Sequence, residues 1–287
     1  MDTSNISKLP VVLWGAGNLA WSLVGGILRR QAIAPSNLRV TNLSDEYRLG
    51  RFRALGLRCS RERATLLDGA GTVVLLVKPQ DALTALGGMA AGLRPGMLLI
   101  SAVAGLELDT VRSLVPPGVH LVRAMPNTSS QVGQAATAFA VAPGIPVACV
   151  DWTRVLLQTV GTAHMVDESQ LDAVTAVSGS GPAYFYYFCE SLIKAAEQAG
   201  LESGLARSLA VQTLHGAAAM LAEPGADPAA LRAAVTSARG TTEAGLEAMA
   251  QHRLPDAVIQ GVLSATARAR ELGSHLSSNS QPHRPGR

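Results

Sequence analysis

The chain of 287 residues has only three cysteines, Cys59, Cys149 and Cys189, and they lie far apart in the sequence. No CxxC pair occurs, and no pair of histidines lies near any of them, so neither a disulfide framework nor a zinc site is supported. We interpret the cysteines as structural thiols and expect no metal in the functional site.

Long apolar stretches are also missing. Hydrophobic residues make up 48% of the sequence, but no run of them reaches the length of a membrane-spanning helix. Residues 1–10 lack the basic and long apolar regions of a signal peptide. We therefore expect a soluble, cytoplasmic protein with no membrane partner, long enough for two domains with ample core.

Aromatic residues and lysines are scarce. Aromatics are 4% of the chain, and the only lysines are Lys8, Lys78 and Lys194, so arginine carries nearly all of the positive charge behind a net charge of +3. The short arginine clusters lack interleaved aromatics, which is better explained by solvated surface and a phosphate site than by nucleic-acid binding. No nucleic-acid partner is predicted.

The first half of the chain carries a dinucleotide-binding pattern. The apolar run 11–14 leads directly into the sequence GAGNLA at 15–20, and apolar residues on helical spacing continue to Arg30. In this GxGxxA pattern Gly15 makes the tight turn, Gly17 lets a pyrophosphate approach the backbone, and Ala20 allows close helix–strand packing. The next strand, expected at 38–42, arrives at the spacing that the pattern requires.

The end of that second strand usually selects the cofactor. NAD-dependent enzymes place a carboxylate there for the ribose 2′-hydroxyl, whereas this chain has Asn42 and Ser44, with Asp45 at the start of the next helix. Ser44, Arg48 and Arg51 could supply hydrogen bonds and positive charge to a 2′-phosphate, or the arginines could merely solvate a helix face. We favour NADPH and keep NADH as an alternative.

The alternation of strands and helices predicts an α/β fold with a doubly wound, Rossmann-type sheet as the domain 1–167. Each strand ends in a small or polar loop, and ligands of parallel α/β sheets bind at those carboxyl ends. Further strands are expected at 72–77, 97–101, 119–123, 139–141 and 163–166, with helices from Lys78–Gln80 to Ala91 and over 147–160.

The second half reads as an all-α domain, 168–273, followed by a disordered tail, 274–287. The run SGSGPAY at 178–184 interrupts the pattern as a hinge between domains, or as both hinge and cleft wall, which we favour. The apolar helices predict a dimer partner. Helices are expected at 182–200, 204–222, 228–236, 241–252 and 255–272.

A second irregular segment spans residues 235–243. Thr241 or Thr242 can cap the helix that follows, with Glu243 in its first turn. The segment can be no more than a capped helix start. Its free N–H groups and hydroxyls would also suit a substrate carboxylate.

Six motifs are spread along the chain: GAGNLA at 15–20, VKPQ at 77–80, ISAVAG at 100–105, RAMPNT at 123–128, DAVTAVSGSGPAY at 172–184 and VTSxxGTT at 235–242. Taken together, these segments resemble the pyrroline-5-carboxylate reductase family over nearly the whole chain, to about Leu272. The resemblance implies reduction of the cyclic imine of 1-pyrroline-5-carboxylate to L-proline with NAD(P)H. It also implies an N-terminal Rossmann domain and a helical C-terminal domain that interlocks into a homodimer, often assembled further.

The resemblance also assigns roles to residues, with part of each site contributed by the partner subunit. Thr242 would lie near the imine nitrogen with Ser237 beside it as the catalytic pair, and Asn127 would lie toward the nicotinamide. A protonated imine accepts hydride readily, so such a site needs apolar walls, a hydroxyl or water near nitrogen and an anchor for the carboxylate, but no strong base. The substrate-binding set is Glu168, Gly240, Thr241 and Thr242. The cofactor-binding set is Trp14, Gly15, Ala16, Gly17, Asn18, Leu19, Ser44, Arg48, Leu76, Val77, Lys78, Pro79, Ala102, Val103, Ala104 and Asn127.

The chain departs from the family pattern in its substrate loop. The family usually reads SPGGTT where this chain has SARGTT at 237–242, so Arg239 replaces a glycine and would be strained at a left-handed position. Gln134-Ala135 also replaces a more usual Glu-Gly. These changes leave open a reductase of a larger or substituted cyclic imino acid in specialised metabolism, and a non-catalytic NADPH-binding homologue. A 3-hydroxyacid or 6-phosphogluconate-type dehydrogenase would need Lys194 as its catalytic lysine, and that residue lacks the expected glycine-rich approach.

Overall fold

The structure, a computed structural model, describes residues 3–42, 45–62 and 64–280. The chain forms two compact units. The first, called the α/β unit here, contains the residues up to Ser180 and those from Ser264 onward, and the second, the helical unit, is Gly181–Leu263. The first boundary between the units, after Ser180, lies later in the chain than the domain boundary predicted at residue 168. The end of the last helix belongs to the α/β unit.

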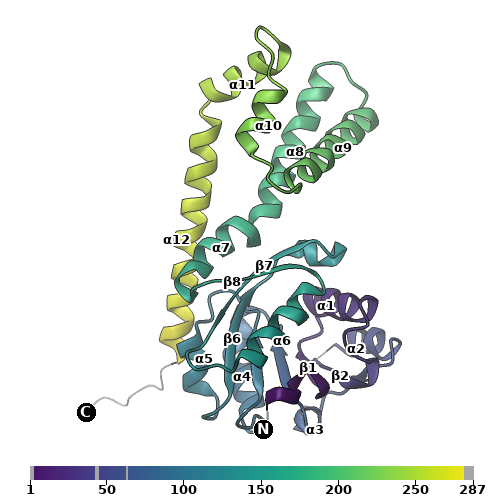
Figure 1. Ribbon diagram of the computed structural model, residues 1–287, viewed down its shortest axis with the longest axis vertical. Coiled ribbons are helices and arrows are strands. Elements are labelled where there is room, and N and C mark those ends of the chain that lie inside the picture. Colours follow the sequence, from purple (N-terminus) through teal and green to yellow (C-terminus); the bar gives the residue numbers. More distant parts are fainter. Residues whose placement is uncertain (1–2, 43–44, 63, 281–287) are drawn as a thin grey trace, which may run out of the picture. The chain divides into compact units, whose positions relative to one another are not determined.

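One sheet organises the α/β unit (Figure 1). Its eight strands lie in the order β3-β2-β1-β4-β5-β6-β7-β8. Neighbouring strands are parallel except for the antiparallel pair β6–β7. The predicted Rossmann-type α/β fold is confirmed, but β7 and β8 run opposite to the other six strands, and β3 is an addition. The strands are β1 (Val11–Trp14), β2 (Leu38–Thr41), β3 (Arg58–Cys59), β4 (Thr72–Leu75), β5 (Leu98–Ser101), β6 (His120–Met125), β7 (Ala135–Val141) and β8 (Gly161–Met165).

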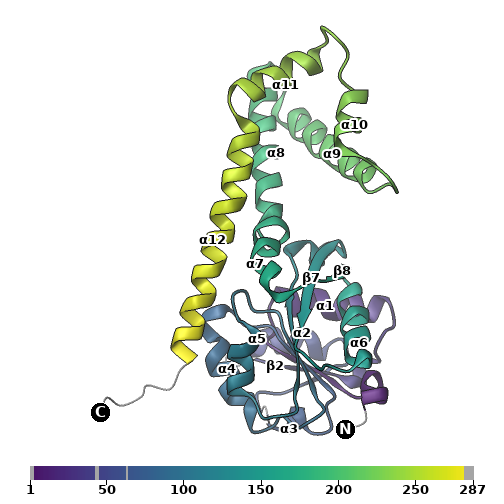
Figure 2. The same ribbon diagram turned by 60° about the vertical axis from the view of Figure 1, so that its left-hand side comes forward.

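Helices cover both faces of this sheet (Figure 2). The helices of the α/β unit are α1 (Asn18–Arg29), α2 (Glu46–Arg53), α3 (Ala64–Leu67), α4 (Ala82–Ala90), α5 (Leu108–Leu114), α6 (Val147–Gln158) and α7 (Leu171–Val174).

Successive residues of a strand serve opposite faces, which explains why the central strands are apolar throughout. Val11 and Leu13 of β1 pack in the cluster with α1 and α6, whereas Val12 and Trp14 pack in the cluster with α4 and α5. All four residues of β1 and of β4 are buried. Each fully buried Val, Leu or Ile contributes about 1.5–3 kcal/mol to folding, so these runs stabilise the centre of the sheet around β1.

The helical unit contains little buried surface of its own. Over residues 181–263 only Gly181, Ala206 and Ala210 are buried. Five consecutive aromatic residues, 184–188, expose between 37% and 74% of their surface. An apolar surface of this extent marks an interface with another molecule, in line with the predicted dimer partner. The helices are α8 (Gly181–Gln198), α9 (Ser203–Leu221), α10 (Pro228–Ala234), α11 (Thr241–Gln251) and α12 (Leu254–Ser280), the last of which ends in the α/β unit.

The expected disorder from residue 274 is wrong for residues 274–280, because α12 continues to Ser280. The Oγ of Ser277 lies 3.0 Å from Oγ1 of Thr110 in α5, and Leu276 packs against the apolar cluster that contains α4 and α5. Gly273 lies so close to Gly105 that a Cβ on Gly273 would be 3.1 Å from the Gly105 carbonyl oxygen. Long-range contacts of this kind order a serine-rich segment that local composition predicts to be disordered. The rest of the predicted tail lies outside the described residues.

Within the described residues, no helix is both long and apolar enough to cross a membrane.

Candidate active site

A cavity of about 400 Å³ opens where β1, β2 and β4 end. It contains eight of the predicted cofactor residues, and it is the position at which parallel α/β sheets bind ligands. Ser44 lies outside the described residues, and the other predicted cofactor residues, Asn18, Leu19, Pro79, Ala102, Val103, Ala104 and Asn127, do not line this cavity. The lining residues are Trp14, Gly15, Ala16, Gly17, Thr41, Asn42, Asp45, Arg48, Leu76, Val77, Lys78, Gln80, Asp81 and Ala85.

The glycine turn between β1 and α1 has the form that the sequence predicts. Gly15 has φ +127°, and a Cβ there would lie 2.5 Å from the carbonyl oxygen of Leu76, so only glycine fits. Gly17 is the N-cap of α1, and nothing lies within 4 Å of where its Cβ would be. The free N–H groups of the first turn of α1 and the open space over Gly17 suit the pyrophosphate of a dinucleotide.

Thr41, the last residue of β2, is a cavity residue that sequence reasoning missed. Its hydroxyl is buried and has no hydrogen-bond partner among the described residues. A buried hydroxyl without a partner costs about 1–3 kcal/mol, which a polar group of a bound nucleotide would relieve. The chemistry of this cavity therefore fits a dinucleotide at both the phosphate turn and the end of β2.

The two arginines proposed for a 2′-phosphate have different surroundings. Arg48 lines the cavity, and its Nε lies 2.9 Å from Oδ2 of Asp45. Asp45 is the N-cap of α2, as predicted, because its Oδ1 accepts the N–H of Arg48. The guanidinium of Arg51 instead stacks over the ring of Trp21, 4.1 Å from the ring centroid, and does not line the cavity. Arg48 alone of the two fits a role in cofactor recognition.

Glu168, a predicted substrate residue, is held within the α/β unit. Its Oε1 accepts hydrogen bonds from Nη1 of Arg123 at 3.2 Å and from the N–H of Leu108 at 2.8 Å. Arg123 is almost completely buried, and its Nη2 also lies 3.4 Å from Oδ1 of Asp172. The network fixes the position of this carboxylate, whose role toward substrate stays a prediction.

The substrate loop lies in the helical unit and starts α11. The N–H of Gly240 donates to the carbonyl of Ser237, and Arg239 between them has φ +58°. The position that the family pattern gives to glycine is therefore left-handed, as expected. A left-handed conformation is unfavourable for arginine, and the hydrogen bond from its N–H to Oε2 of Glu243, at 2.6 Å, helps to hold it.

The prediction that Thr241 or Thr242 caps α11 is wrong. Gly240 is the N-cap and the helix begins at Thr241, with no capping hydrogen bond from a side chain. Packing selects glycine here, because a Cβ on residue 240 would lie 2.4 Å from Oγ of Ser237. The threonine hydroxyls are thus not used as caps at the start of α11.

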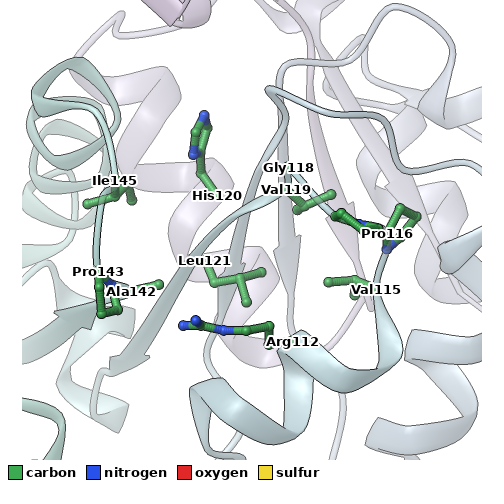
Figure 3. A pocket seen from close by; sticks show the side chains of 11 residues that line it. Arg112, Val115, Pro116, Gly118, Val119, His120, Leu121, Ala142, Pro143 and Ile145 are labelled. Atoms are coloured by element: carbon green, nitrogen blue, oxygen red, sulfur yellow. The ribbon is translucent and has the colours of Figure 1, made fainter.

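A second cavity, of about 340 Å³, lies where β6 begins and β7 ends. Because β6 is parallel to β5 and β4, this is the edge of the sheet opposite the glycine turn. Figure 3 shows Arg112 and His120 among its lining side chains, together with several prolines and aliphatic residues. Burial lowers the pKa of His120. None of the predicted site residues lines this cavity.

Together the Rossmann-type sheet, the glycine turn and the cavity beside it are typical of dinucleotide-dependent oxidoreductases. Residues 10–105 match the family model described as NADP oxidoreductase coenzyme F420-dependent, and residues 168–272 match that described as pyrroline-5-carboxylate reductase dimerisation. The chain belongs to the pyrroline-5-carboxylate reductase family, as its sequence motifs predict.

Individual relatives agree with this assignment. Pyrroline-5-carboxylate reductase 1 of Bacillus subtilis is 35% identical over 95% of this chain and 92% of its own length. The solved pyrroline-5-carboxylate reductase of Coxiella burnetii has a TM-score of 0.87 and 31% identity, covering 92% of this chain and 98% of that one. The Plasmodium falciparum enzyme, solved with NADP bound, has a TM-score of 0.83 and 26% identity, covering 93% and 99%.

Proposed function

We propose that this protein reduces 1-pyrroline-5-carboxylate to L-proline, with NADPH as the hydride donor. The observation that carries the proposal is the combination, in one chain, of a dinucleotide cavity and a region of the reductase dimerisation type at residues 168–272. Near full-length similarity to proteins named pyrroline-5-carboxylate reductase supports the same substrate.

NADPH is favoured over NADH by the end of β2. In the sequence, Asn42, Leu43 and Ser44 follow the last residue of β2, so no carboxylate comes directly after the strand, and Arg48 lines the cavity. Asp45 borders it too, but its carboxylate is engaged with the N–H and the Nε of Arg48. The ion pair orients Arg48, and among the described residues its terminal nitrogens have no hydrogen-bond partner, so they can serve an anionic oxygen. NADH remains an alternative donor.

NADPH, when bound, supplies the hydride, and the chain supplies the binding and orientation of the imine. The free N–H groups at the start of α11 would hold the substrate carboxylate, with Gly240 and Thr241 beside it. The hydroxyls of Thr242 and Ser237 would hold the proton on the imine nitrogen, which makes the adjacent carbon electrophilic. Glu168 would complete the substrate contacts. No strong base is required, so orientation provides most of the rate acceleration.

Arg239 supports a second candidate, a reductase of a larger or substituted cyclic imino acid. This arginine is exposed and adds a cation next to the start of α11. If Arg239 abolished catalysis altogether, the protein would bind NADPH without reducing an imine.

The test is the oxidation of NADPH by the purified protein with pyrroline-5-carboxylate and, in parallel, the six-membered piperideine-6-carboxylate. Faster turnover of the five-membered ring supports the proposal, whereas faster turnover of the larger ring supports the second candidate. Failure to turn over either ring, with NADPH still bound, would contradict both.

Thr242→Val tests the catalytic assignment, because valine keeps the shape and removes the hydroxyl. Thr236→Val is the matched control, since the Thr236 hydroxyl is used locally, donating to the Arg232 carbonyl. We expect Thr242→Val to lower kcat at least tenfold, the usual size of a lost transition-state contact, and the control to change it about twofold at most. Equal effects would refute the role of Thr242.

We also propose that the protein forms a homo-oligomer and that it lies in the cytoplasm. A homodimer or higher homo-oligomer is supported by the exposed aromatic run 184–188 and by the dimerisation-type region. A cytoplasmic location is supported by the three cysteines, which are free thiols, as is usual in reducing compartments. Cell fractionation with a tagged chain tests the location.

A further inference from the structure

The chain leaves the α/β unit through an irregular helical turn. After α7 ends at Val174, residues Thr175–Gly179 form a π-helical turn, and the N–H of Ser180 donates to the carbonyl of Thr175 at 2.9 Å. The hydroxyl of Ser178 bonds back to the carbonyl of Val174 at 3.1 Å. Turns of this kind, with serine hydroxyls competing for helix carbonyls, occur where a helix is bent and often at functional positions.

The carbonyl of Ser178 has a specific deficit in this turn. In a continuous helix it would accept the N–H of the residue four positions later, which is Pro182, and proline has no N–H to donate. The side chain of Asn127 supplies a hydrogen instead, because its Nδ2 lies 3.0 Å from the Ser178 carbonyl oxygen. A residue of the turn after β6 thus replaces a helical hydrogen bond that the sequence forbids.

The other end of the Asn127 amide is also engaged. Its Oδ1 accepts the N–H of Ala136 in β7 at 3.4 Å. A carbonyl on one side and an N–H on the other leave one orientation for the amide. The end of β6 also packs against the hinge, since a Cβ on Gly179 would lie 2.6 Å from Cε of Met125. Asn127 therefore ties the hinge to two strands of the sheet.

We propose that Asn127 is a positioning residue that fixes the hinge at Ser178 and thereby the reaction geometry, rather than a ligand of the nicotinamide. The inference rests on the proposed function. It follows from where the parts of the site lie: the dinucleotide cavity is in the α/β unit, the substrate loop is in the helical unit, and the main chain first passes from one to the other at Ser180. The turn that Asn127 holds therefore begins the segment that carries the substrate loop.

A double-mutant cycle tests the proposal, using Asn127→Ala, Pro182→Ala and the double variant. Pro182→Ala restores an N–H that can donate to the Ser178 carbonyl, so it should make Asn127 partly dispensable. We expect Asn127→Ala to lower kcat about tenfold and Tm by about 2–4 °C, as for one unsatisfied carbonyl, with the Kd for NADPH within about twofold of the parent. The double variant should recover at least half of both losses.

Asn127→Asp and Gln131→Ala complete the design. Aspartate keeps the acceptor for Ala136 but cannot donate to Ser178, so it should behave like alanine. Gln131 is exposed in the turn that follows Asn127 and should tolerate alanine without effect.

If the effects of Asn127→Ala and Pro182→Ala on kcat and Tm are strictly additive in the double variant, the proposal is wrong. A rise of tenfold or more in the NADPH Kd of Asn127→Ala would also overturn it. The second result would return Asn127 to the cofactor site. If pyrroline-5-carboxylate is not the substrate, kcat is lost as a readout for every variant including the parent. The coupling in Tm and the NADPH Kd still decide the role of Asn127, so the two failures are distinguishable.

Discussion

Nη1 of Arg123 lies 3.2 Å from Oε1 of Glu168, and the same carboxylate oxygen accepts the N–H of Leu108 at 2.8 Å. The side chain of Arg123 is only 7% exposed, so the ion pair joins β6, the start of α5 and the segment after β8 from inside the fold. Its second partner, Asp172, also lies 4.0 Å from Nε of Arg270 in α12.

Removal of Arg123 should destabilise the protein strongly. Arg123→Met keeps most of the apolar stem but leaves two carboxylates without their buried cation, which costs about 3 kcal/mol in the free energy of unfolding. Arg154→Met is the control, because Arg154 pairs with Asp151 at the surface and such pairs contribute about 1 kcal/mol or less. Urea titrations of both variants measure the difference. Similar values would show that the network contributes little.

Alanine substitutions at the two glycines of the phosphate turn should weaken NADPH binding for different reasons. Gly15→Ala places a Cβ against the Leu76 carbonyl at a left-handed φ, so it should lower Tm without cofactor and also abolish NADPH binding. Gly17→Ala has open space around its Cβ, so Tm without cofactor should stay unchanged while the Kd for NADPH rises at least tenfold. Thermal melts and fluorescence titrations check both. Normal NADPH affinity in Gly17→Ala would place the pyrophosphate elsewhere.

Arg48 and Arg51 form a matched pair for cofactor choice. Arg48→Ala should raise the KM for NADPH about tenfold and leave that for NADH nearly unchanged, because only NADPH has a 2′-phosphate. Arg51→Ala removes a cation that stacks on Trp21 away from the cavity, so the NADPH to NADH ratio should not change. Steady-state kinetics with both cofactors decide. An equal loss for both cofactors in Arg48→Ala would argue against recognition of the 2′-phosphate.

Cys59 gives a pH dependence with a defined sign. Burial raises the pKa of this thiol from 9.0 to about 11. The folded state therefore retains a proton that the unfolded state loses, so this contribution to stability is present below pH 9 and is lost as the pH rises toward 11. The rate of alkylation in a Cys149→Ala, Cys189→Ala background should keep rising to about pH 11 in the folded chain. The same chain in urea should reach its plateau near pH 9. Coincident profiles would contradict the assignment, and Cys59→Ala should remove the stability effect.

Much of the α/β unit could be predicted because its signals are local. The run Thr72–Leu75 is buried on both faces and therefore apolar throughout, and Gly15 must be glycine for a turn that the next strand constrains. The cofactor cavity followed from these two features. Thr41 was missed because an unpartnered hydroxyl can be recognised only when its surroundings are known.

The errors arose where distant residues decide the local structure. Thr241 has the side chain of a good cap, but Gly240 takes that position because it packs against Ser237. Ser277 belongs to a composition typical of disorder, yet its bond to Thr110, which is 167 residues away in the chain, extends α12. The hydrogen bond from Asn127 to Ser178 likewise joins segments that no sequence pattern relates.

The most direct test of the central claim is to follow the hydride itself. The purified protein is incubated with 1-pyrroline-5-carboxylate and NADPH carrying deuterium at the transferable position of the nicotinamide, and the product is analysed by chiral amino-acid separation and mass spectrometry. The proposed function predicts L-proline with one deuterium at the ring carbon that was the imine carbon, in amounts equal to the NADPH consumed. Consumption of NADPH without labelled proline, or no consumption by a protein that binds NADPH, would contradict it.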